Sequence, residues 1–103
     1  MPRLEEDLHV GNLEIIEEVN GLRKKHKEEL EKSKVYYQGD AIYRGKLDEK
    51  SEKSGYGEFY VGEKIYFGMF ENDKPNGYGL AVKNDESYYK GNFKDGVFDG
   101  FGK

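Results

Sequence analysis

Residues capable of acid–base or metal chemistry are few in this chain and widely separated. His9 and His26 are the only histidines, there is no cysteine, and no nucleophile–base pair or cluster of ligands surrounds either histidine. A general base must reach the proton that it abstracts, and a zinc site needs three or four suitable ligands. We therefore predict no catalytic residues, no cofactor and no metal site, and we expect that the protein is not an enzyme.

Aromatic side chains are the other chemically distinctive group, and they favour recognition. All nine tyrosines and six phenylalanines lie at Tyr36 or later, and the motif Tyr-x-Gly-x-(Phe/Leu) recurs every 23 residues. Alternation of large residues at period two places them on one face of a strand. Such rings either pack on one another across strands or line a groove for a peptide or helix. The recurring positions are Tyr43, Leu47, Tyr66, Phe70, Tyr89 and Phe93.

The elements that position these rings are predicted to be β-hairpins in series. In each copy a polar turn and a Gly-aromatic-Gly triplet follow the first strand. Two strands joined by a short polar turn form a hairpin, and consecutive hairpins form a meander. The copies are residues 42–64, 65–87 and an incomplete 88–103, with a degenerate copy at 35–40. Strands are expected near 41–47, 57–61, 65–71, 79–83 and 88–94.

These residues resemble the MORN (membrane occupation and recognition nexus) repeat. The copies "YYKGNFKDGVFDGFGK" and "IYFGMFENDKPNGYG" carry the resemblance, and the first copy departs from it by having Leu47 at the aromatic position. The resemblance implies a mainly β protein: a single-layered antiparallel meander of about three hairpins, used to hold other molecules. The family's association with cytoskeletal and ciliary assemblies implies a similar setting here.

The N-terminal segment, residues 1–34, is predicted to be helical and distinct from the β-array at 35–103. Within 12–33, Asn12 is a candidate N-cap, and apolar residues with one histidine form a stripe along one face. A helix with a narrow stripe needs a surface to pack against. That surface is the chain's own sheet, a second copy through a short coiled coil, or another protein. The stripe comprises Ile15, Ile16, Val19, Leu22, His26 and Leu30.

The second sheet face is apolar in the middle copy. Ile65, Phe67 and Met69 alternate with the recurring aromatic residues, and an exposed apolar triplet of this kind requires a cover. We expect the chain's own helix to be that cover, with a partner protein as the alternative. These three residues are therefore further candidates for partner binding.

The charge distribution narrows the classes of partner. The formal net charge is −4, and no long run of basic residues is present, so nucleic-acid binding is not expected. Anionic phospholipid is a less favoured partner than protein, because Lys64, Lys83 and Lys90 have acidic neighbours in the sequence. The leading hypothesis is a non-catalytic scaffold that binds a peptide or helix in the cytoplasm.

Two further alternatives concern the context of the chain. One alternative is that the chain is a regulatory or targeting segment of a larger protein. The strand near 88–94 is also expected to leave an open edge beside Phe98 and Phe101, and open edges are templates for pairing. Self-association through that edge is therefore an alternative to a separate partner.

Overall fold

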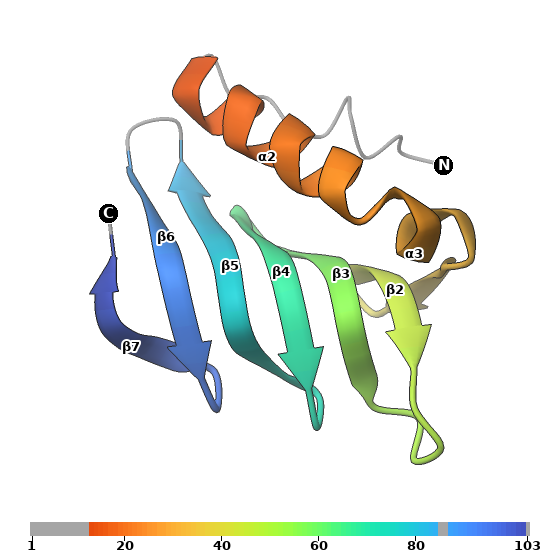
Figure 1. The fold of residues 1–103 in the computed structure, drawn as a ribbon. Coiled ribbons are helices and arrows are strands. Elements are labelled where there is room, and N and C mark those ends of the chain that lie inside the picture. Colours follow the sequence, from red (N-terminus) through yellow and green to blue (C-terminus); the bar gives the residue numbers. More distant parts are fainter. Residues whose placement is uncertain (1–12, 85–86, 103) are drawn as a thin grey trace.

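The computed structural model describes residues 13–84 and 87–102. Its single sheet has seven antiparallel strands in chain order, and two helices lie across one face of it (Figure 1). The predicted single-layered meander with an N-terminal helix is thereby confirmed. His9, Asn12 and the start of the predicted helical segment lie outside the described residues.

The helices and strands account for most of the described chain. The helices are α2 (Leu13–Lys25) and α3 (Lys27–Glu31). The strands are β1 (Lys34–Gln38), β2 (Ala41–Leu47), β3 (Lys53–Val61), β4 (Lys64–Glu71), β5 (Lys74–Asn84), β6 (Ser87–Lys94) and β7 (Val97–Gly102). The three copies correspond to the hairpins β2–β3, β4–β5 and β6–β7, and β1 is the strand of the degenerate copy.

Strands β3 and β5 begin earlier than predicted because the turns before them are tighter, whereas β2 has the predicted bounds. In the middle hairpin only Asn72 and Asp73 form the turn, and both have positive φ, at 51° and 72°. Positive φ at both central residues gives a type I′ turn, whose twist matches that of the flanking strands. Pairing therefore begins at once with Glu71 opposite Lys74, and Pro75 lies inside β5. Our prediction of a longer polar turn was wrong there.

The first hairpin has a longer turn, residues 48–52, between β2 and β3. The Asp48 carboxylate accepts hydrogen bonds from the backbone N–H groups of Lys50 (2.8 Å) and Glu52 (3.0 Å). An aspartate that bonds the following backbone substitutes for a backbone turn. One side chain thus closes the loop between β2 and β3.

Strand β7 corrects the expectation of an open edge at β6. The turn at Asp95 and Gly96 returns the chain, and β7 pairs with residues 91–94 of β6. The third hairpin is therefore formed, and β7 rather than β6 is the outer strand. The side chain of Phe101 is not among those described.

The N-terminal segment is helical as predicted, but it bends at His26. That residue has φ −109° and ψ 29°, which separates α2 from α3. The His26 ring stacks on Tyr56 of β3, with centroids 4.4 Å apart and planes 6° from parallel. The bend turns α3 onto β2 and β3, whereas α2 lies over β4 and β5.

The main core lies between the helices and the sheet. Ile15, Val19, Leu22 and Leu30 of the predicted stripe are buried there against Phe67 and other residues of β3, β4 and β5. Ile16 is only partly buried. Of the three surfaces considered for the stripe, the helices use the chain's own sheet.

A buried ion pair crosses this core. Arg23 of α2 donates two hydrogen bonds to the Glu58 carboxylate of β3, at 2.9 and 3.0 Å. The hydroxyls of Tyr56 and Tyr60 donate to the same carboxylate, at 3.3 and 3.5 Å. Glu58 is fully buried. A buried charge needs this degree of pairing, so the contact determines where α2 lies on the sheet.

Candidate functional site

The sheet face away from the helices carries a continuous series of rings, which we call the aromatic face. Each neighbouring pair meets edge to face: Tyr43 with Phe70 (5.4 Å), Phe70 with Tyr66 (5.0 Å), Tyr66 with Phe93 (5.1 Å) and Phe93 with Tyr89 (5.2 Å). Each phenylalanine thus lies between the tyrosines of two successive copies. Edge-to-face packing of this kind stabilises the fold beyond the contribution from burying the rings.

The repeated tyrosines are fixed at both ends. The hydroxyls of Tyr43, Tyr66 and Tyr89 donate to the carbonyl oxygen three residues later, at 2.7, 2.8 and 3.1 Å. Burial raises the pKa of Tyr43 to about 12 and also raises that of Tyr66. Both hydroxyls therefore remain protonated donors at neutral pH. Because they are committed to the backbone, these hydroxyls stabilise the face itself.

The glycine of each motif makes room for its tyrosine. A Cβ added at Gly68 would lie 2.7 Å from the Tyr66 hydroxyl oxygen and 2.5 Å from the Cα of Gly79 on the next strand. A side chain at Gly68 would therefore meet both the ring and a neighbouring backbone. Glycine between two large residues of a strand leaves space of this kind for their rings.

We expect Gly68→Val to destabilise the protein by about 1–3 kcal/mol, because the new side chain forces the Tyr66 ring and β5 apart. The measurement is urea unfolding followed by circular dichroism. Gly21→Ala is the control, because a Cβ at the exposed Gly21 meets nothing within 4 Å. Alanine there should stabilise α2 by up to about 1 kcal/mol. A Gly68→Val protein as stable as the parent would contradict the close packing described here.

Of the six aromatic-face candidates, Leu47 does not join the series. It is 36 % exposed at the end of β2, whereas Tyr43, Tyr66, Phe70 and Phe93 are buried and Tyr89 is partly buried. Lys53 lies opposite Leu47, with its ammonium 4.5 Å from the ring centre of Phe59. A salt bridge of 3.2 Å to Asp73 fixes that ammonium. The lysine therefore lies over the rings at this end of the face.

Three aromatic residues of this face were missed in the sequence, and one of them, Tyr36 of β1, packs on Tyr43 with ring centroids 6.0 Å apart. Phe59 is partly buried against the series, and Phe98 stacks on Tyr89 with centroids 4.1 Å apart. Both lie on the second strand of a hairpin, outside the Tyr-x-Gly-x-Phe motif. The signal that could have identified Phe59 and Phe98 is a glycine two residues before each ring, Gly57 within β3 and Gly96 in the turn before β7.

The other three partner-binding candidates lie under the chain's own helices. Phe67 is fully buried, and Ile65 and Met69 are partly buried against the core beneath α2 and α3. A separate partner cannot reach Phe67 while the helices are docked. The helix-covered face is thus occupied, whereas neither helix of the described residues packs on the aromatic face.

His26 and Glu29 hold α3 on the sheet. The Glu29 carboxylate accepts a hydrogen bond from the backbone N–H of Tyr56 at 3.1 Å, next to the irregular pairing of β2 and β3. Burial alone would raise the pKa of Glu29, but the Tyr56 N–H and the His26 ring lower it overall. A lowered folded-state pKa gives stability at neutral pH that is lost as the pH falls through that pKa. Both side chains therefore have structural partners.

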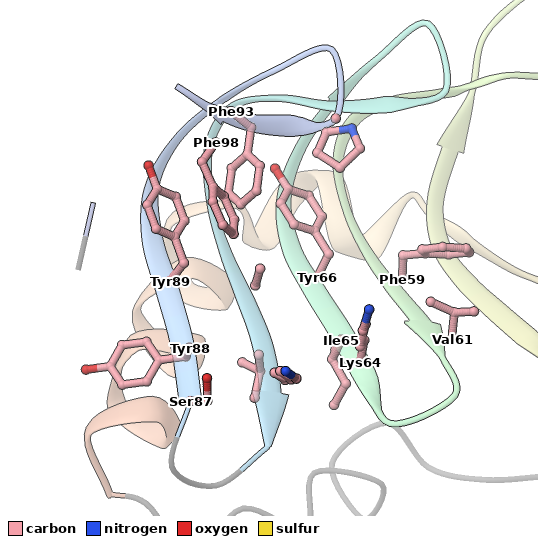
Figure 2. Close-up of a pocket in the computed structure, with 15 residues that line it drawn as sticks. Phe59, Val61, Lys64, Ile65, Tyr66, Ser87, Tyr88, Tyr89, Phe93 and Phe98 are labelled. Atoms are coloured by element: carbon pink, nitrogen blue, oxygen red, sulfur yellow. The ribbon is translucent and has the colours of Figure 1, made fainter. Parts of the chain in front are cut away.

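A hollow of about 650 Å³ lies on the aromatic face, bounded by strands β3 to β7. Figure 2 shows Tyr66, Tyr89, Phe93 and Phe98 gathered toward one end of it, with α2 behind the strands. Phe98 is 61 % exposed and Val61 44 % exposed. Ligand sites are commonly concave and apolar, with a few polar groups at their edge.

The family model for the MORN repeat matches residues 66–87 and 89–103. These two segments of the chain are MORN repeats. No curated protein matches the chain. MORN repeats are in general modules for interaction with proteins or membranes. The two matched segments include Tyr66, Phe70, Tyr89 and Phe93, so the motif and the ring series coincide there.

Within residues 13–84 and 87–102, no group of three or more His, Asp or Glu side chains is arranged to hold a metal ion. Neither helix in that part of the protein is long and apolar enough to cross a membrane.

Proposed function

We propose that this protein is a non-catalytic interaction module that binds a peptide or helix of a partner protein on its aromatic face. The observation that carries the proposal is the asymmetry of the sheet. One face is covered by α2 and α3, and the other is left hollow with apolar side chains exposed along it. Exposed concave apolar surfaces on soluble domains are commonly interaction sites.

Phe98 is the side chain best suited to test the proposal. It lines the hollow, is 61 % exposed and belongs to the outer strand, so little of the fold depends on it. Val97 is the matched control, because it is 64 % exposed and its side chain alternates to the opposite face. The two positions differ mainly in the face that they present.

We expect Phe98→Ser to weaken binding at least about tenfold, as for an aromatic anchor, and Val97→Ser to leave it unchanged. The probe is a peptide selected by the parent protein from a displayed random library. Fluorescence anisotropy gives the Kd, and melting curves establish that both variants are folded. Binding that is insensitive to Phe98→Ser would place the peptide elsewhere and contradict the proposal.

We further propose a cytoplasmic location in association with a cytoskeletal or ciliary assembly. Support comes only from the resemblance of the repeats to arrays used in such assemblies. Imaging of a tagged full chain beside microtubule, actin and axonemal markers tests it. A diffuse distribution that matches none of these markers would contradict the association, and a luminal secretory signal would contradict the location.

A further inference from the structure

Two lysines lie side by side at one end of the hollow. Ile65 of β4 is paired with Val82 of β5. Lys64 and Lys83 are the next residues beyond this pair at the same end of the two strands. Both therefore share the aromatic face with Tyr66 and line the hollow. Figure 2 shows Lys64 near Ile65 and Val61, at the end away from Phe93 and Phe98.

Unlike Lys53 and Lys90, these two lysines have no carboxylate partner among the residues that the structure describes. Lys53 pairs with Asp73 at 3.2 Å, and Lys90 pairs with Glu18 at 2.6 Å. Among the residues that the structure describes, no ion pair involves Lys64 or Lys83. Like charges on neighbouring strands destabilise a sheet, and an anion placed over both relieves that repulsion.

The floor of the hollow offers few free polar groups. The hydroxyls of Tyr66 and Tyr89 donate to the carbonyl oxygens of Met69 and Asn92 and are thereby committed. A ligand on this floor gains mainly from apolar contact. Its polar specificity must therefore come from the lysines at the edge.

We propose, on the basis of the proposed function, that the aromatic face selects a partner segment with apolar side chains and acidic residues at one end. The apolar side chains contact the rings around Tyr66 and Phe98. One or more Asp or Glu carboxylates lie over Lys64 and Lys83. The charges thus determine the direction in which the segment lies across the strands.

A peptide fits these charges better than an anionic membrane does. Recruitment to lipid gains about 1 kcal/mol per basic residue near the surface and needs several of them. Here only two unpaired lysines border the hollow, Glu63 lies on the adjacent turn, and the net charge of the chain is −4. Two lysines are enough, however, to orient one acidic segment.

The test is a selection from a displayed random peptide library against the parent protein and against Lys64→Glu/Lys83→Glu. We expect the parent to enrich apolar peptides with Asp or Glu toward one end, and the variant to enrich Lys or Arg there. The best parent-selected peptide should bind the variant at least about tenfold more weakly. The control is Lys24→Glu/Lys25→Glu on the exposed side of α2, which changes net charge equally and should leave the Kd unchanged.

Each other outcome has a defined meaning. The selected peptides could show no preference for acidic residues, with a Kd that is unchanged by the lysine reversals but raised by Phe98→Ser. That result would overturn this inference and leave the proposed function intact. Peptides insensitive to all these changes would overturn both. The protein could instead sediment with vesicles of three parts phosphatidylcholine to one part phosphatidylserine in a manner that depends on the two lysines, while no acidic peptides are selected. That result would identify lipid, and not a peptide, as the ligand of the lysines. A dimer that excludes the selected peptide from the hollow would assign the face to a second copy.

Discussion

Replacing Arg23 by alanine is expected to destabilise the folded protein by about 3–5 kcal/mol, measured by urea unfolding. The guanidinium supplies two of the hydrogen bonds to Glu58, whose side chain is fully buried. Without it, a carboxylate remains in the core with only the hydroxyls of Tyr56 and Tyr60 as donors. For a chain of this size that loss is a large share of the total stability.

A double variant separates the cost of an unpaired charge from the loss of other Arg23 contacts. Arg23→Ala/Glu58→Gln removes both charges and keeps an acceptor for the tyrosine hydroxyls. It should recover much of the stability that the single variant loses, since the uncompensated charge is gone. A single variant that loses less than about 1 kcal/mol would show that the pair behaves like an exposed one.

Replacing Phe70 by alanine is expected to cost about 3–5 kcal/mol, because a buried ring is lost from the centre of the aromatic face. Phe70 is only 4 % exposed and contacts the rings of Tyr43 and Tyr66 edge to face. The cavity would remove support from both tyrosines at once. Thermal and urea unfolding measure the change.

Phe70→Leu is the matched control, and it should cost less than about 1.5 kcal/mol because most of the volume is retained. Tyr37→Ala, at a side chain 54 % exposed on β1, should cost less still. If Phe70→Ala melts like the parent but loses peptide binding, the ring serves the ligand alone. Our account of Phe70 as a structural member of the series would then be wrong.

The burial of each aromatic residue indicates whether it serves mainly folding or mainly ligand binding. Phe70 and Phe93 are buried within the series, so their replacement affects folding before it affects a ligand. Phe98 is exposed on the same face, so its replacement tests binding with little effect on folding. Experiments on this protein should therefore distinguish Phe98 from the repeated motif.

Local spacing determined the repeat. A period of two within each strand and of 23 between copies is enough to place Tyr43, Tyr66 and Tyr89 on one face, because side chains alternate along any extended strand. The stripe of Ile15, Val19 and Leu22 likewise follows from helical periodicity alone. These features depend on neighbours in the chain, and sequence records them directly.

Turn geometry was harder to predict from the sequence, because it depends on the backbone angles of single residues. Asn72 and Asp73 both adopt positive φ, so a segment that reads as a long polar turn becomes mostly strand. The exclusion of Leu47 from the ring series depends in turn on Lys53, which lies opposite it across the sheet. Sequence spacing does not reveal which residue of a cross-strand pair covers the rings.

By itself, the sequence determined the hairpin array, the helix stripe and the aromatic motif, because each is a periodicity within one segment. The apolar triplet Ile65, Phe67 and Met69 also predicted which sheet face the helix covers, but the position of the helices on that face became known only from contacts between distant residues. That position depends on Arg23 meeting Glu58 across 35 positions of the chain, and on His26 stacking on Tyr56. The pairing of distant residues through a buried charge leaves no periodic signal, so the sequence does not show where on the sheet the helices are held.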